Sequence, residues 1–198
     1  MKAIVAALTM IAAITPAVAE DALVEGGRSP DGGYEVRLVR TPDYSPDKDG
    51  SEYLFHIRAG DKTLVTVAGS GFRGYPVAKE YCKALWDKSG RFVAITDRDT
   101  RHSTAFHIVA VSPDKTQELE IPHYAQNALG RVDATEVDIA SVSTPIRWDD
   151  DELIMEYYFT ANGRRSYTCD VTLHVRHEDH SVPSVGLKAV TKPKENEG

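Results

Sequence analysis

Short stretches in which apolar and polar residues alternate run through most of this 198-residue chain. In the stretch YTCDVTLHV, every second position is filled by Tyr167, Cys169, Val171, Leu173 and Val175. Successive side chains of a β-strand point to opposite faces, so this period of two predicts a strand with one buried face. The stretches YEVRLV, RFVAIT, STAFHIVAVS and ELIMEYYFT are also rich in β-forming residues. We therefore predict an all-β fold.

Turn-forming residues between these stretches indicate hairpins. Residues 53–68 contain two alternating runs around Ala59 and Gly60, and glycine readily adopts a positive φ. Asn162-Gly163 provides a strong hairpin signal between two later strands. Residues 122–130 are predicted to form one or two helical turns. An antiparallel two-sheet sandwich accommodates all of these elements.

The first nineteen residues have the composition of an export signal. Lys2 is followed by an apolar run that is too short to span a bilayer, and Ala17-Val18-Ala19 supplies the small residues that signal peptidase requires. We expect cleavage after Ala19 and delivery to the periplasm or the exterior. Residues 20–192 are then a single β-domain, and residues 193–198 a polar, disordered tail. No later stretch is apolar enough for membrane insertion.

The net charge argues against one class of partner, and the two cysteines indicate a possible disulfide. The chain carries 23 basic and 30 acidic residues, a net charge of −7, and loss of Lys2 with the leader would make it −8. An acidic protein repels phosphate backbones, so we expect no nucleic-acid partner. The two cysteines, Cys82 and Cys169, are predicted to form a disulfide in an oxidising compartment, with two separate buried thiols as the alternative.

One sequence pattern, a polar turn followed by an alternating strand, occurs at three places. The three segments are SPDGGYEVRLV from Ser29, WDKSGRFVAIT from Trp86 and WDDDELIMEYY from Trp148. They resemble the W-S-P-D-G-x-x-L-A blade starts of TolB-type β-propellers. This resemblance implies, as the alternative fold, a small or incomplete propeller-like repeat. However, Trp86 and Trp148 are 62 residues apart, whereas propeller blades usually repeat every ~40–50 residues. Three segments are also too few, because a closed propeller needs about four blades or more. The sandwich is therefore the preferred prediction.

No catalytic or metal-binding motif stands out from the sequence. His174, His177 and His180 lie three residues apart, and positions with that spacing face opposite sides of a strand. The acidic run WDDDE lacks the alternation of a calcium loop. Gly69-Ser70-Gly71 does not complete the G-x-S-x-G nucleophile turn. We therefore expect no metal and no cofactor.

Two predicted loops carry side chains suited to binding. Aromatic and arginine side chains give large contact energies at interfaces, and these loops contain Phe72, Arg73 and Tyr75 in the first and Arg98, Arg101 and His102 in the second. We predict a non-enzymatic binding protein whose partner is an unknown protein or a component of the cell envelope. An exported hydrolase with a composite loop site is one alternative.

A second alternative comes from the segment SGFRGY, residues 70–75. It resembles the S-G-x-x-Y loop that periplasmic lysozyme inhibitors insert into the lysozyme cleft. The resemblance implies inhibition of lysozyme or of another hydrolase. In this chain the tyrosine, Tyr75, comes one residue later than in that pattern.

Overall fold

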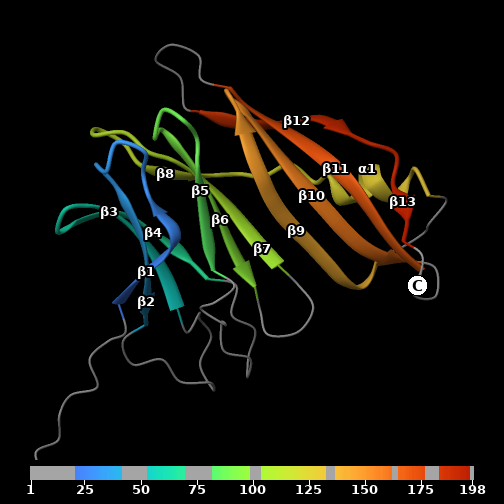
Figure 1. Ribbon diagram of the computed structural model, residues 1–198, viewed down its shortest axis with the longest axis horizontal. Coiled ribbons are helices and arrows are strands. Elements are labelled where there is room, and N and C mark those ends of the chain that lie inside the picture. The colour runs from blue at the N-terminus through green and yellow to red at the C-terminus, as the bar shows by residue number, and fades with distance from the viewer. Residues whose placement is uncertain are drawn as a thin grey trace, which may run out of the picture.

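The described strands form three antiparallel meanders of four strands each, which follow one another along the chain (Figure 1). The structure is a computed structural model, and it describes residues 21–41, 53–69, 82–98, 104–132, 137–161, 165–176 and 183–196. Unit 1 consists of β1 (Asp21–Arg28), β2 (Glu35–Arg40), β3 (Tyr53–Ala59) and β4 (Lys62–Ala68). Unit 2 consists of β5 (Lys83–Trp86), β6 (Phe92–Arg98), β7 (Thr104–Ala110) and β8 (Gln117–Leu119). Unit 3 consists of β9 (Val137–Asp149), β10 (Glu152–Ala161), β11 (Arg165–Arg176) and β12 (Ser184–Val190).

The three units are arranged in two sheets. A parallel contact between β1 and β5 joins units 1 and 2 into one eight-stranded sheet, with the order β4-β3-β2-β1-β5-β6-β7-β8. This sheet curls until its two edge strands, β4 and β8, lie near each other. Unit 3 and the short strand β13 (Lys194–Glu195) form the second sheet. The prediction of an all-β fold built from two sheets is therefore confirmed, and β1 with β5 is the one parallel pair among the described strands.

Unit 2 lies in the middle and buries both of its faces. Phe92, Val93, Ala94 and Ile95 are consecutive, and each is at most 4% exposed. Phe92 and Ala94 belong to the core that unit 2 shares with unit 3, whereas Val93 and Ile95 belong to the core shared with unit 1. Strands covered on both faces have continuous apolar runs instead of an alternating pattern, which explains the composition of β6.

The two cysteines lie in different cores and are not bonded to each other. Cys82 packs between units 1 and 2, while Cys169, on β11, packs between units 2 and 3. The predicted Cys82–Cys169 disulfide is therefore wrong. The alternation around Cys169 correctly indicates burial, but it carries no information about which core the other cysteine occupies.

The ends of the chain differ in what the structure describes. The predicted leader, residues 1–19, lies outside the described residues. Residues 194 and 195, expected in an unstructured tail, instead pair with β11 through Tyr167 and Thr168. The predicted helical turn within residues 122–130 is present as α1 (Ala125–Leu129). Within the described ranges, no helix combines the length and apolar character needed to cross a membrane.

Gly26 allows β1 and β5 to approach each other. The register of β1 against β2 shifts between Leu23 and Arg28, so β1 is irregular where it passes β5. Gly26 has a φ of +70°, and a Cβ at this position would lie 2.3 Å from the carbonyl oxygen of Ala84. A glycine is therefore required here for two reasons, its backbone conformation and the close approach of the neighbouring strand.

Replacing Gly26 tests how much the joint between units 1 and 2 contributes to stability. Gly60 is the matched control, because its φ is +55° and nothing would lie within 4 Å of an added Cβ. Gly60→Ala should lower the free energy of unfolding by the about 1–2 kcal/mol that a left-handed conformation costs a residue with a Cβ. Gly26→Ala should cost clearly more in urea denaturation, because β5 must also move. Equal losses would contradict this account.

Thiol titration tests the pairing of the cysteines. Protein denatured without reductant should yield two reactive thiols per chain, and none would indicate a disulfide. In the folded protein, burial raises the pKa of the Cys169 thiol to about 11. Only about one in a thousand such thiols is ionised at pH 8, and the thiolate is the reactive form. Cys169 should therefore react with a disulfide reagent far more slowly in the folded chain than after denaturation.

Candidate functional site

The repeated segments occupy the same place in each unit. Residues 29–34 connect β1 to β2, residues 87–91 connect β5 to β6, and residues 150–151 connect β9 to β10. Each is the connection between the first and second strand of its meander. The recurrence in the sequence therefore corresponds to a recurrence in the structure.

The first two of these turns share one hydrogen-bonding pattern. Ser29 donates its backbone N–H to Tyr34 O at 3.0 Å, and Asp87 donates its own to Phe92 O at 2.9 Å. In return, Tyr34 N donates to Ser29 Oγ at 2.9 Å, and Phe92 N donates to Asp87 Oδ1 at 2.7 Å. The fourth residue of each turn is a glycine, with φ near +70° in both cases. A serine and an aspartate thus perform the same task at equivalent positions.

The third connection is shorter. Asp149 and Glu152 pair directly, which leaves a two-residue turn made of Asp150 and Asp151. Asp150 has a φ of 52°, a left-handed conformation that aspartate tolerates better than most residues. The carboxylates of Asp150 and Asp151 are exposed at the tip of this hairpin.

Two aromatic stacks hold the neighbouring connections together. Trp86 stacks on Tyr34 with ring centroids 6.3 Å apart, and Trp148 stacks on Phe92 at 6.1 Å. In both pairs, a tryptophan at the end of a first strand meets the aromatic residue that closes the turn of the preceding unit. Trp148 Nε1 also donates to the carbonyl of Leu85 at 2.9 Å.

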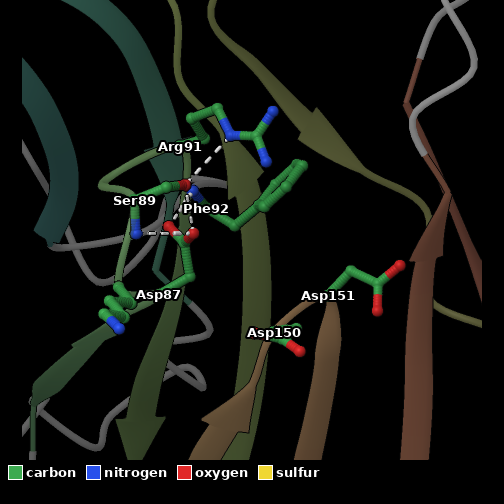
Figure 2. Close-up of a pocket in the computed structure, with 7 residues that line it drawn as sticks. Asp87, Ser89, Arg91, Phe92, Asp150 and Asp151 are labelled. Carbon is green, nitrogen blue, oxygen red and sulfur yellow. Dashed lines mark hydrogen bonds between the residues drawn. The ribbon is translucent and has the colours of Figure 1, made fainter.

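A pocket of about 620 Å³ lies between the second and third connections (Figure 2). Its lining residues are Asp87, Lys88, Ser89, Arg91, Phe92, Asp150 and Asp151. Figure 2 shows Arg91 and Phe92 on one side and the two aspartates of the hairpin on the other. The pocket therefore has the guanidinium of Arg91 on one side and the exposed carboxylates of Asp150 and Asp151 on the other.

Two side chains of the turn that line the pocket, Ser89 and Arg91, are held in place by hydrogen bonds. Ser89 donates its backbone N–H to Asp87 Oδ2 at 3.0 Å, and its hydroxyl donates to the same oxygen. Arg91 Nε in turn donates to Ser89 Oγ at 2.9 Å, and its guanidinium lies 5.8 Å from the centre of the Phe92 ring. Both oxygens of the Asp87 carboxylate accept hydrogen bonds within the turn, whereas Arg91 lines the pocket.

A second polar cluster adjoins the pocket. His174, on β11, lies directly opposite Glu152 on β10. Its Nε2 is 3.5 Å from Asp151 Oδ2, and its Nδ1 is 3.9 Å from Glu152 Oε1. Lys188, on β12, contacts Glu152 Oε1 as well. Asp151 belongs both to this cluster and to the pocket.

The side chains of the two binding loops predicted from the sequence are not among those that the structure describes. Phe72, Arg73, Tyr75, Arg101 and His102 lie outside the described residues, and Arg98 is described only as the end of β6. The pocket was not predicted, although its residues belong to the repeated segments. The tryptophan before each of the last two turns is the signal that could have indicated it, because it brings successive turns together.

No family model, no curated protein and no solved structure matches the chain. What the site can do must therefore follow from its own residues. Between described residues, no hydrogen bond joins a histidine ring to a hydroxyl or a thiol. The histidine–acid contacts there are those of His174 and that of His107 Nδ1 with Glu118 Oε1, at 2.6 Å. Among the described residues, therefore, no histidine ring is hydrogen-bonded to a hydroxyl or thiol that it could activate as a nucleophile.

Asp87 is the residue whose removal should damage this site most. It is 4% exposed and accepts hydrogen bonds from Phe92 N and from Ser89. Asp87→Ala should lower the free energy of unfolding by about 2–3 kcal/mol, because bonds to a charged acceptor are lost and the N–H of Phe92 stays buried. Asp150→Asn, an exposed change that tolerates the same backbone conformation, should stay within about 0.5 kcal/mol of the unchanged protein. Similar losses in both variants would contradict the assignment.

Proposed function

We propose that this chain is an exported, non-enzymatic binding domain, and that its ligand occupies the pocket between turn 87–92 and the β9–β10 hairpin. The observation that carries the proposal is the opposition of charge across the pocket, with Arg91 on one side and Asp150 and Asp151 on the other. The leader predicted at residues 1–19 supports export.

The charges suit a ligand that carries both signs. An acidic group would pair with Arg91, whose guanidinium can form two parallel bonds with a carboxylate. A basic group on the same ligand would lie near Asp150 and Asp151. Phe92 also lines the pocket, on the same side as Arg91. A peptide segment with an acidic and a basic side chain close together is the ligand class that fits these features.

The rigidity of the turn supports binding as the function. The Ser89 hydroxyl, the Asp87 carboxylate and Arg91 Nε are all engaged in hydrogen bonds before any ligand arrives. The Trp148 stack fixes Phe92 from the side of unit 3. A site that is already ordered loses less conformational entropy on binding, so more of the contact energy remains as affinity.

The other predicted contacts remain part of the proposal. Phe72, Arg73 and Tyr75 in one loop, and Arg98, Arg101 and His102 in the other, are expected to extend the contact with a large partner. They form a second set of substitutions, to be examined after those in the pocket.

A peptide array tests the proposed function. The array should contain peptides with adjacent acidic and basic residues, together with peptides of equal length that carry only one sign. We expect mixed-charge peptides to be retained best. Arg91→Gln should weaken the best binder at least about tenfold in fluorescence anisotropy, the loss expected for one charge-assisted pair. Arg176→Gln, an exposed change on β11, should leave affinity unchanged.

Two outcomes would count against the proposal. Equal binding by the unchanged protein and the Arg91→Gln variant would exclude the pocket as the site. New peptide termini, detected by mass spectrometry in the same samples, would show that the domain is an enzyme.

A further inference from the structure

Unit 3 brings together one imidazole and two carboxylates from two adjacent strands and the turn that precedes one of them. The β10–β11 register pairs Glu152 with His174, and the turn places Asp151 next to Glu152. The backbone supports this arrangement, because Val175 N donates to Asp151 O at 2.8 Å and so ties the turn to β11. The cluster therefore rests on paired strands and not on the turn alone.

The spacing of the three side chains suits one metal ion. One ligand atom can be chosen from each residue so that all three lie within 4.8 Å of one another. A transition metal binds nitrogen and oxygen at ~2.0–2.2 Å, so neighbouring ligand atoms around one ion lie roughly 3–3.6 Å apart. The 3.5 Å between His174 Nε2 and Asp151 Oδ2 already has this value. Glu152 Oε1 lies 3.9 Å from the other ring nitrogen, Nδ1, so the Glu152 side chain must turn toward Nε2 for the three residues to share one ion, and its partial exposure leaves room for that rotation.

The donor types indicate the class of metal. Calcium and magnesium prefer oxygen ligands throughout, whereas zinc and its neighbours accept imidazole nitrogen together with carboxylate oxygen. Three protein ligands leave at least one coordination position for water or for a ligand. We propose that Asp151, Glu152 and His174 bind a divalent transition-metal ion such as Zn²⁺.

Lys188 makes the proposal unusually easy to test. Its ammonium contacts the same Glu152 oxygen that lies 3.9 Å from His174 Nδ1. A divalent cation must compete with this ammonium for Glu152, and the positive charge of Lys188 repels it. Loss of the lysine should therefore strengthen metal binding, whereas in a purely structural network of ion pairs it would only remove a contact.

The test is calorimetric titration of the metal-free full chain with zinc chloride alone at neutral pH. We expect one zinc ion per chain at this site. His174→Ala should weaken that binding at least about tenfold, and Glu152→Gln should weaken it as well. Lys188→Met should tighten it several-fold. His123→Ala, at an exposed position in the connection between β8 and α1, is the control and should have no effect.

The proposal fails if His174→Ala binds zinc as tightly as the unchanged protein, or if no binding is detected up to millimolar zinc. It also fails if Lys188→Met binds zinc no more tightly than the unchanged protein. Circular dichroism of each variant separates lost binding from lost folding. Arg91→Gln should keep full zinc affinity, so this site and the proposed peptide site can fail independently. Asp151 lines both sites and is left unchanged for that reason.

Discussion

Burial of unit 2 on both faces is the constraint on which the rest of the structure depends. A four-stranded meander with apolar side chains on both sides cannot remain exposed to water, because each buried residue of this kind contributes about 1.5–3 kcal/mol through burial. Unit 1 covers Val93 and Ile95, and unit 3 covers Phe92 and Ala94. The layering of the three units follows from this requirement.

The aromatic stacks give that layering a direction. Trp86 and Trp148 each reach back to the preceding unit, so the same contact is used twice. The strand registers identify the residues that occupy the equivalent positions in the two outer units. Arg28 occupies the position of the tryptophans in unit 1, and Glu152 occupies the position of Tyr34 and Phe92 in unit 3. Neither Arg28 nor Glu152 has an aromatic ring, so among the described residues this ring-on-ring contact occurs at the two junctions between units and not at the outer ends of the series.

Sequence patterns predicted the local structure well and the long-range contacts poorly. The alternation through β11 and the positive φ of Gly60 depend on neighbouring residues, and both are present. The separation of Cys82 and Cys169 depends on the stacking order of the units, which no local pattern encodes. The neighbours of His174 were missed for the same reason. They come from β10 and from the turn before it, and only the register of β10 against β11 places them beside His174.

The two tryptophans also make each junction visible on its own. Trp86 lies at the junction of units 1 and 2, and its buried indole N–H has no partner among the described residues. Trp148 lies at the junction of units 2 and 3, and its indole N–H is hydrogen-bonded to Leu85 O. Because indole fluorescence depends on polarity and hydrogen bonding, the two tryptophans should differ in their emission. Two variants, each keeping only one of these tryptophans, would together report whether the outer units detach from unit 2 at the same time or one after the other.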